Sequence, residues 1–227
     1  MNTRRQCPFL FVIAVGGSLG GFVHGATFLQ PFVQYTVRDA FPEDGIADYL
    51  LPSDESGYIG QITGPGPANF GEETFLEFDV RSRGLQEAAN LHFNFYYSDI
   101  ENGTGKRISV SAYAAVGVPT LSAFGTGNLI GTFVLPSIPS PGGSHPLTVD
   151  VTPVVNAQIL AGVDFVGFRL HDAMFNEGSP LLGIGTAQVA LGSGSGLLPQ
   201  SLELVPEPPS DVLACFLTGL LMIWSRR

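Results

Sequence analysis

Residues 90–97 read Asn90-Leu91-His92-Phe93-Asn94-Phe95-Tyr96-Tyr97. Successive side chains of a β-strand point to opposite faces. One face of this stretch would carry Leu91, Phe93, Phe95 and Tyr97, and the other would carry Asn90, His92, Asn94 and Tyr96. The alternation therefore predicts a strand with one buried face and one solvent-facing side.

Short stretches of the same kind recur along most of the chain. Residues 74–80 place Leu76 and Phe78 on the expected inner face and Phe75 and Glu77 on the outer face. Further strands are expected at residues 28–37, 58–63, 107–115, 129–135, 147–151, 165–171, 184–191 and 201–205. Clusters of Gly and Pro separate them, as turns do. This arrangement indicates an all-β protein, and we expect a single jelly-roll-like β-sandwich rather than a βαβ fold.

One segment, residues 152–162, departs from the strand pattern. Thr152 is a common N-cap residue, Pro153 suits the first helical position, and Gly162 suits the position just past a helix end. We therefore expect one short helix, which would cover the mouth of the sandwich.

The last 23 residues combine three features in a fixed order. A Pro-rich box covers residues 205–211, an apolar stretch covers 212–224, and a basic end covers 225–227. The apolar stretch would insert into a membrane as a hydrophobic helix, and the arginines of the basic end would stay on the cytoplasmic side. Its 13 residues would span about 20 Å as a helix, which is short of the roughly 30 Å hydrocarbon core. The tail thus suits a transient anchor.

This tail resembles the PEP-CTERM sorting signal of Gram-negative bacteria. The resemblance rests on the order of the three features, and it implies that the sorting residues are Val205, Pro206, Glu207, Pro208, Arg226 and Arg227. It also implies a processing enzyme, an exosortase, that acts near the Pro-Glu-Pro box while the tail holds the protein in the inner membrane. A simple C-terminal membrane anchor is the alternative interpretation.

Residues 1–26 have the layout of a secretory signal peptide. Arg4 and Arg5 precede an apolar stretch over residues 8–22, and Gly25 and Ala26 supply small residues for cleavage. A buried N-terminal helix is the alternative, but each glycine in this stretch would cost about 1 kcal/mol in a helix interior. We therefore expect the export machinery to translocate the region between the two hydrophobic segments.

Residues 27–204 remain as the predicted ectodomain, and their number suits one domain. They carry six basic and 18 acidic side chains, which give a formal net charge of −12. A surface of this charge repels nucleic acid. Cys7 and Cys215 both lie in the targeting segments, so the ectodomain must be held together by its hydrophobic core rather than by disulfides.

Several short motifs between residues 74 and 204 look like those of the DNRLRE-type β-sandwich, which is similar to certain carbohydrate-binding modules. They are Leu76-Glu77-Phe78-Asp79-Val80, Ala88-Ala89-Asn90-Leu91-His92-Phe93, Leu147-Thr148-Val149-Asp150-Val151-Thr152, Gly167-Phe168-Arg169-Leu170 and Leu198-Pro199-Gln200-Ser201-Leu202-Glu203-Leu204. The literal Asp-Asn-Arg-Leu-Arg-Glu string does not occur in the sequence. The resemblance therefore implies a fold rather than an activity.

The sequence of the ectodomain contains no recognisable catalytic motif. Its histidines, His92, His145 and His171, have no metal-ligand spacing, and no Gly-x-Ser-x-Gly motif marks a nucleophile. His92 alternates with asparagines, which indicates a surface residue. His171-Asp172 would form half of a catalytic dyad, but no nucleophile completes it. We expect that the protein is not an enzyme.

Two sets of residues are candidates for binding. Tyr58, Tyr96 and Tyr113 would stack on a sugar or another flat ligand if their rings face outward. A second set, which offers oxygen ligands suited to calcium, consists of Asp39, Glu43, Asp44 and Asp48. The spacing of these acids is not that of an EF-hand, and a solvated acidic loop is the simpler interpretation. No cofactor is expected apart from this candidate Ca²⁺ site.

Together these features predict an exported, non-catalytic protein of the cell surface or extracellular matrix. It would pass through an intermediate anchored in the inner membrane and would then be processed at its tail. A biofilm matrix rich in exopolysaccharide would suit such a protein. The alternative is a carbohydrate-binding module for envelope or exopolysaccharide glycans.

Overall fold

The computed structural model describes most of the predicted ectodomain. The described residues are 25–40, 46–52, 56–62, 70–100, 106–135, 144–173, 186–192 and 200–207. The predicted signal peptide and hydrophobic tail lie outside these ranges, except for residues 25–26 and 205–207. In the described part of the chain, none of the helices is both long enough and apolar enough to cross a membrane.

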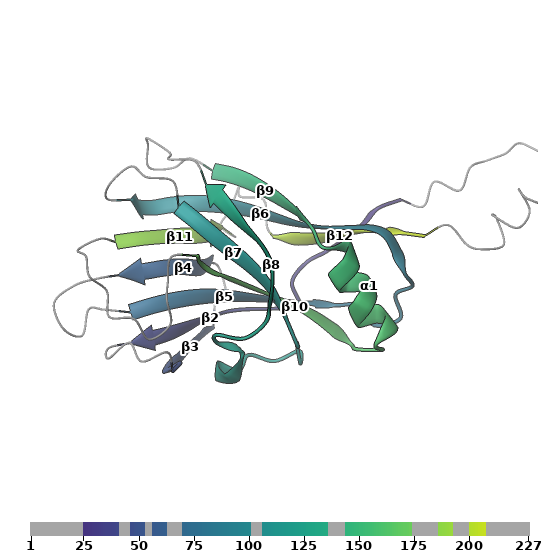
Figure 1. Cartoon of the computed structure of the whole chain (residues 1–227), viewed down its shortest axis with the longest axis horizontal. Helices are drawn as coiled ribbons and strands as arrows, with labels where there is room; N and C mark the ends of the chain where they lie inside the picture. The colour runs from purple at the N-terminus through teal and green to yellow at the C-terminus, as the bar shows by residue number, and fades with distance from the viewer. Residues whose placement is uncertain are drawn as a thin grey trace, which may run out of the picture.

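The described residues form an all-β fold with one α-helix (Figure 1). The strands are β1 (Thr27–Leu29), β2 (Val33–Ala40), β3 (Tyr49–Pro52), β4 (Ser56–Ile62), β5 (Phe70–Asp79), β6 (Gln86–Ile100), β7 (Lys106–Tyr113), β8 (Asn128–Leu135), β9 (Ser144–Asp150), β10 (Phe165–Asp172), β11 (Thr186–Gly192) and β12 (Ser201–Pro206). The helix α1 covers Thr152–Leu160, and a 3-10 turn, η2, covers Leu121–Ala123.

The strands pair in antiparallel fashion and build two layers. One layer has the order β3-β2-β5-β10-β7-β8. In the other layer β9 pairs with one side of β6, while β11 and β12 share its other side. β1 extends this layer beyond β12, and β4 extends it beyond β11. Because β4 also pairs with the start of β5, the two layers join along one edge.

The main core lies between the two layers. Leu76 and Phe78 of β5 face it from one layer, and Leu91 and Phe93 of β6 face it from the other. These four side chains are at most 1% exposed, whereas His92 between them is partly exposed. The alternation thus predicted the strand and its inner face as far as Phe95, but Asn94, which was expected to meet solvent, is only 8% exposed. The side chain of Tyr97 lies outside the described part of the structure. The β-sandwich predicted from the sequence is confirmed.

The predicted strand at residues 28–37 is wrong as a single element. The structure divides it into β1 and β2, which belong to different layers. Pro31 lies between the two strands and has no N–H group for a ladder. The chain therefore pairs with β12 through β1, and after Pro31 it pairs with β5 through β2. The sequence analysis also missed β3, a short edge strand.

The predicted short helix is present, and it closes one end of the sandwich (Figure 1). Val155 of α1 is fully buried in the main core. The N-cap is Val151 rather than Thr152. The Thr152 hydroxyl instead accepts a 2.8 Å hydrogen bond from the backbone N–H of Ala89. Gly162 follows the helix with a φ of 69°, as expected for a residue just past a helix end.

A second, smaller cluster covers the opposite face of β5. Its buried members are Tyr35, Val37, Phe75, Tyr113, Ala123 and Phe124. The rings of Tyr35 and Phe75 stack with their centroids 5.0 Å apart. The chain between β7 and β8, which includes η2, folds back over this face. Phe75 and Glu77 were expected to point to solvent, but both are fully buried under this segment.

Candidate functional site

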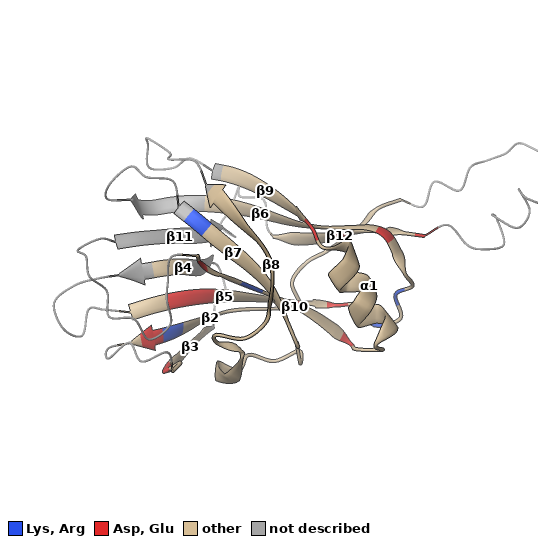
Figure 2. Ribbon diagram, viewed as in Figure 1, with Lys and Arg blue, Asp and Glu red and all other residues tan. Residues whose placement is uncertain are grey.

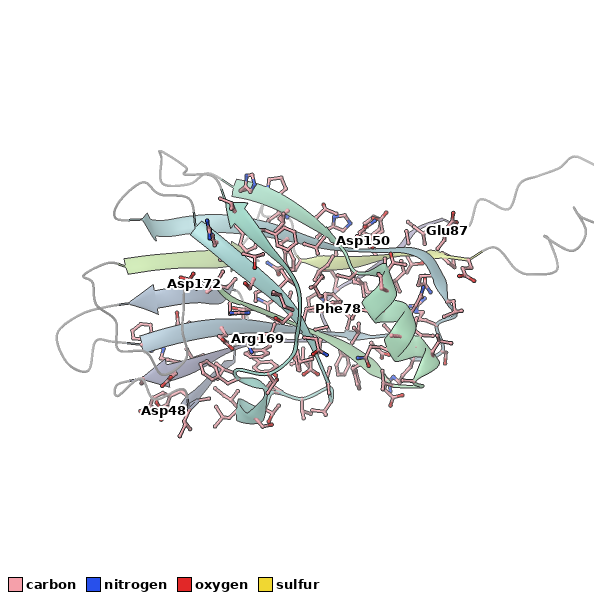
Figure 3. The ribbon with its side chains drawn as sticks, viewed as in Figure 1. Asp48, Phe78, Glu87, Asp150, Arg169 and Asp172 are labelled. Atoms are coloured by element: carbon pink, nitrogen blue, oxygen red, sulfur yellow. The ribbon has the colours of Figure 1, made fainter. Side chains whose placement is uncertain are left out.

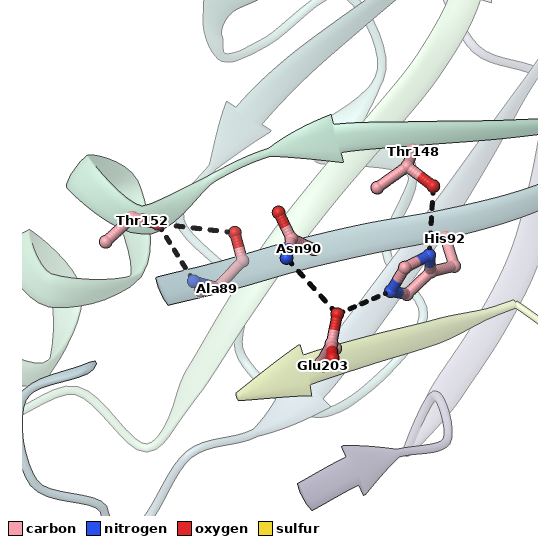
Figure 4. A network of polar contacts seen from close by, with 6 residues as sticks. All are labelled: Ala89, Asn90, His92, Thr148, Thr152 and Glu203. Carbon is pink, nitrogen blue, oxygen red and sulfur yellow. Dashed lines mark hydrogen bonds and ion pairs between the residues drawn. The ribbon is translucent and has the colours of Figure 1, made fainter. Parts of the chain in front are cut away.

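A network of polar side chains occupies the solvent face of β6 and its two neighbours (Figure 4). His92 Nδ1 lies 3.1 Å from the hydroxyl of Thr148 on β9, and Nε2 lies 3.0 Å from Glu203 Oε2 on β12. Asn90 donates a 3.2 Å hydrogen bond from Nδ2 to the same carboxylate oxygen. One continuous set of donors and acceptors therefore spans three strands.

The register of the strands explains why these residues meet. Thr148 and Ser201 lie opposite His92 on the two flanking strands. Glu203 lies opposite Asn90. Side chains two apart on a strand share a face, and cross-strand pairs approach closely enough to bond. The polar positions of β6, β9 and β12 thus form rows across the layer.

The network also fixes the charge of its carboxyl group. Hydrogen bonds from His92, and then from Asn90, lower the pKa of Glu203 below its ordinary value. Glu203 is therefore ionised at neutral pH and acts only as an acceptor. A neutral imidazole with its proton on Nε2 donates to this carboxylate and accepts from the Thr148 hydroxyl on Nδ1.

An exposed aromatic ring borders the network. Phe28 of β1 is 58% exposed, and its ring centroid lies 6.0 Å from that of His92. Both residues line a hollow of about 370 Å³, whose other lining residues are Gln30, Phe93, Asn94, Pro146, Leu147, Thr148 and Ser201. The site thus combines an accessible ring, apolar side chains and uncharged polar groups.

The order hydroxyl, imidazole and carboxylate is that of a hydrolase triad. A triad also needs donors for an oxyanion, usually backbone N–H groups. Over residues 90–92, β6 pairs with β9 on one side and with β12 on the other. Its backbone N–H and C=O groups there form the hydrogen bonds of these two strand pairs. At residues 90–92 the backbone of β6 therefore has no free N–H group for an oxyanion.

A larger hollow, of about 990 Å³, lies between α1 and the segment around the start of β8. Alanine and aliphatic side chains make up much of its lining, and its single aromatic residue, Tyr113, is only 5% exposed. Asp150 lies at its edge, beside the start of α1 (Figure 3), and accepts hydrogen bonds from the backbone and hydroxyl of Thr152. These bonds also lower the pKa of Asp150. This hollow therefore has no exposed ring.

Buried charges join the second cluster to the sheet. Arg169 Nε lies 3.2 Å from Glu73 Oε2, and Arg169 Nη1 donates to the carbonyl of Thr126 at 2.7 Å. Arg169 comes from β10, in the middle of its layer (Figure 3). On the other face of this layer, Arg38 Nε donates to Glu72 Oε1 at 3.0 Å, where charged stretches of β2 and β5 run side by side (Figure 2). These pairs hold elements of the fold together.

The three candidate tyrosines have different outcomes. Tyr113 was expected to face outward, and this prediction is wrong. Its ring packs in the second cluster, and its hydroxyl donates a 2.8 Å hydrogen bond to Glu77. The segment after β7 buries it, which strand alternation alone does not reveal. Tyr58 lies on β4 and Tyr96 on β6, but their side chains lie outside the described part of the structure.

The candidate calcium ligands are only partly described. Asp39 is fully buried at the end of β2. Asp48 is exposed, and its Oδ2 accepts a 2.9 Å hydrogen bond from the N–H of Ala40. Glu43 and Asp44 lie outside the described residues. Among the residues that are described, no group of three or more His, Cys, Asp or Glu side chains is placed to hold a metal ion. The calcium site stays a prediction.

The predicted sorting residues begin inside the last strand. Val205 and Pro206 belong to β12, and the N–H of Glu207 donates to the carbonyl of Leu85 at 3.1 Å. Pro208, Arg226 and Arg227 lie outside the described residues. The first three residues of the Pro-rich box are therefore attached to the sandwich.

No protein family model matches this chain, and no curated protein matches it either.

Sequence reasoning identified His92 as a surface residue but missed its partners. Thr148 and Glu203 lie 56 and 111 positions away from it. Only the register of β6 with β9 and β12 brings them together. Phe28 was missed for a related reason, because it was assigned to a longer strand.

Proposed function

We propose that this protein is an exported, non-catalytic β-sandwich of the cell surface or extracellular matrix. Its signal peptide would direct export, and its tail would anchor it in the inner membrane until an exosortase-type enzyme processes it. The support comes from the two hydrophobic segments with their basic flanks, one on each side of a stable acidic domain.

The observation that carries this proposal is the position of the Pro-rich box. The box follows the sandwich with no intervening linker, since β12 contains Val205 and Pro206 and the N–H of Glu207 still bonds to Leu85. A peptidase must bind the chain in its own active site, and β12 is held by pairing with β1 and β6, so the bond that is cut would lie beyond Glu207. The trimmed product would then keep the whole of β12.

Intact mass spectrometry of the protein recovered from its native host tests the proposal. We expect a species that begins near Ala26 and ends near Pro208. A Glu207→Ala, Pro208→Ala double variant should accumulate with its tail attached, while a Ser210→Ala variant should be processed normally. Recovery of a wild-type chain that is intact through Arg227 would contradict the sorting role.

Carbohydrate binding is a second candidate function, and one observation favours it. The polar face in Figure 4 lies beside an exposed phenylalanine, and protein sites for sugars combine an aromatic surface with side chains that donate and accept hydrogen bonds. Retention of the full chain by immobilised polysaccharide, compared with a similarly acidic protein, tests this candidate.

A further inference from the structure

We propose that the hollow beside Phe28, His92 and Thr148 is a binding site for a neutral, hydroxyl-rich glycan. This inference rests on the carbohydrate-binding candidate and assigns it a location and a ligand class. The site does not include the tyrosines that the sequence suggested. It lies on the solvent face of β1, β12, β6 and β9, on the side of this layer away from the main core.

Phe28 supplies the surface on which a sugar ring would stack. A pyranose has one face of C–H groups, which packs on an aromatic ring while its hydroxyls remain at the edge. More than half of the Phe28 side chain is accessible, and Pro146, which is also exposed, adds apolar surface to the lining of the hollow. A single exposed ring needs no explanation, but this one borders a polar hollow.

Thr148 supplies a hydroxyl oxygen that can accept a hydrogen bond from the sugar, and His92 orients it. His92 Nδ1, at 3.1 Å, holds the Thr148 hydroxyl in one orientation, and Glu203 holds the imidazole from the other side. Ordering these groups before the ligand arrives lowers the entropic cost of binding. Gln30 and Ser201 line the same hollow, and each can both donate and accept. This mixture suits hydroxyl groups, which also do both.

Charge selects the class of glycan. Glu203 is ionised next to the hollow, and the ectodomain as a whole carries a formal charge of −12. Both features repel uronate, sulfate and phosphate groups. The same charges would attract a cationic amino sugar, but the residues that line the hollow include no Asp or Glu to pair with one. A neutral glycan therefore fits best.

The size of the hollow agrees with this ligand. Its volume of about 370 Å³ lies in the lower part of the range of small-molecule sites, roughly 300–1,000 Å³. It is large enough for one or two sugar rings, so the rest of a polymer would extend over the surface. Binding of one short stretch predicts weak affinity for oligosaccharides and stronger retention by a polymer with many repeats.

Affinity electrophoresis of the full chain in mild detergent tests the inference. Native gels would contain hydroxyethyl cellulose, laminarin or galactomannan as neutral polymers, alginate as the anionic polymer and chitosan as the cationic polymer. We expect retardation by at least one neutral polymer. Phe28→Ala should weaken it about tenfold, and Thr148→Val should weaken it several-fold while keeping a β-branched side chain. Phe32→Ala is the matched control, because Phe32 is 56% exposed and its ring contacts Phe165 in the same manner.

Each outcome decides one part of the inference. Loss of retardation in Phe28→Ala and Thr148→Val, with Phe32→Ala unchanged, supports the site. Retardation that survives both substitutions places carbohydrate binding elsewhere and overturns the site. Retardation by alginate or chitosan alone overturns the ligand class. No retardation by any polymer ends both the site and the carbohydrate-binding candidate, but it leaves the export and sorting proposal standing.

Discussion

The phenol of Tyr113 donates a 2.8 Å hydrogen bond to the carboxylate of Glu77, on the face of β5 that points away from the main core. Glu77 also accepts a 2.6 Å bond from the backbone N–H of Gly117. Burial raises the pKa of Tyr113, so its hydroxyl stays protonated and keeps donating. One buried carboxylate thus ties the end of β7 and the segment after it to the sheet.

Replacing Tyr113 with Phe should lower the free energy of unfolding by about 1–3 kcal/mol. The substitution keeps the ring but leaves the buried carboxylate of Glu77 with one fewer donor. Chemical denaturation measures the change. Tyr49→Phe is the control, since Tyr49 is 56% exposed and should lose little. Equal stabilities of the two variants would show that the Glu77 contact does not hold this segment in place.

Gly167→Ala should destabilise the same region by about 1–3 kcal/mol. Gly167 lies opposite Tyr113 in the ladder between β10 and β7. A Cβ atom at this position would lie 2.6 Å from Cε1 of the Tyr113 ring and 2.9 Å from Cβ of Ala115. Near-UV circular dichroism should report the displaced tyrosine, and thermal unfolding should report the loss of stability.

Gly84→Ala is the matched control for this change. A Cβ atom at Gly84 would meet nothing within 4 Å, so its effect should stay within about 0.5 kcal/mol. A Gly167→Ala variant as stable as the Gly84→Ala variant would mean that the ring of Tyr113 can move aside freely.

The stability of the protein should fall as the pH drops from about 6.5 towards 4, partly because of His171. Burial, and then the nearby Arg169, lower the pKa of His171 from 6.5 to about 4. The unfolded chain therefore takes up a proton in this interval that the folded chain does not, and protonation favours unfolding. Well above pH 6.5 the imidazole is neutral in both states and the effect disappears.

His171→Gln isolates this contribution. The slope of unfolding free energy against pH between 6.5 and 4.5 should be shallower in the variant than in the wild type. Below about pH 4.5, carboxyl groups whose pKa is lowered in the folded protein, such as Asp79 and Glu203, begin to be protonated more readily in the unfolded chain. Their contributions to stability therefore fall in both the wild type and the variant. Identical slopes above pH 4.5 would show that His171 is protonated equally in the folded and unfolded chains.

The fold was predictable because alternation is a local signal. The inner residues of β5 and β6 could be assigned from a few neighbours in sequence, as Leu76 and Leu91 show. The burial of the outer face of β5 could not be predicted in this way. Whether Phe75 meets solvent depends on a segment some 40 residues later that folds back over it, and nothing near Phe75 in the sequence reports this.

The candidate site was less predictable than the fold, for a related reason. Alternation placed His92 on the outer face, but the identity of its partners depends on strand order and register. The pairing of Ser201 with His92, and of Thr148 with His92, follows from two separate ladders. A shift of either strand by one residue would turn the partner side chain into the core.

The contact between Asn156 and Gln86 is expected to fix α1 against the sandwich. The N–H of Gln86 donates to Asn156 Oδ1 at 2.8 Å, and Asn156 Nδ2 donates to the carbonyl of Gln86 at 2.9 Å. Gln86 is only 3% exposed, so water cannot readily replace these bonds. Asn156→Ala should therefore cost about 2–4 kcal/mol for the two buried groups that it leaves without partners.

Two further variants separate the hydrogen bonds from the helix itself. Asn156→Asp keeps an acceptor for the N–H of Gln86 but sets a second oxygen against its carbonyl, so most of the stability should still be lost. Gln158→Ala, in the same helix, should stay within about 0.5 kcal/mol of the wild type. Hydrogen exchange at Gln86 should become faster in both Asn156 variants and remain slow in Gln158→Ala. Unchanged protection in Asn156→Ala would mean that the burial of Val155 alone holds the helix in place.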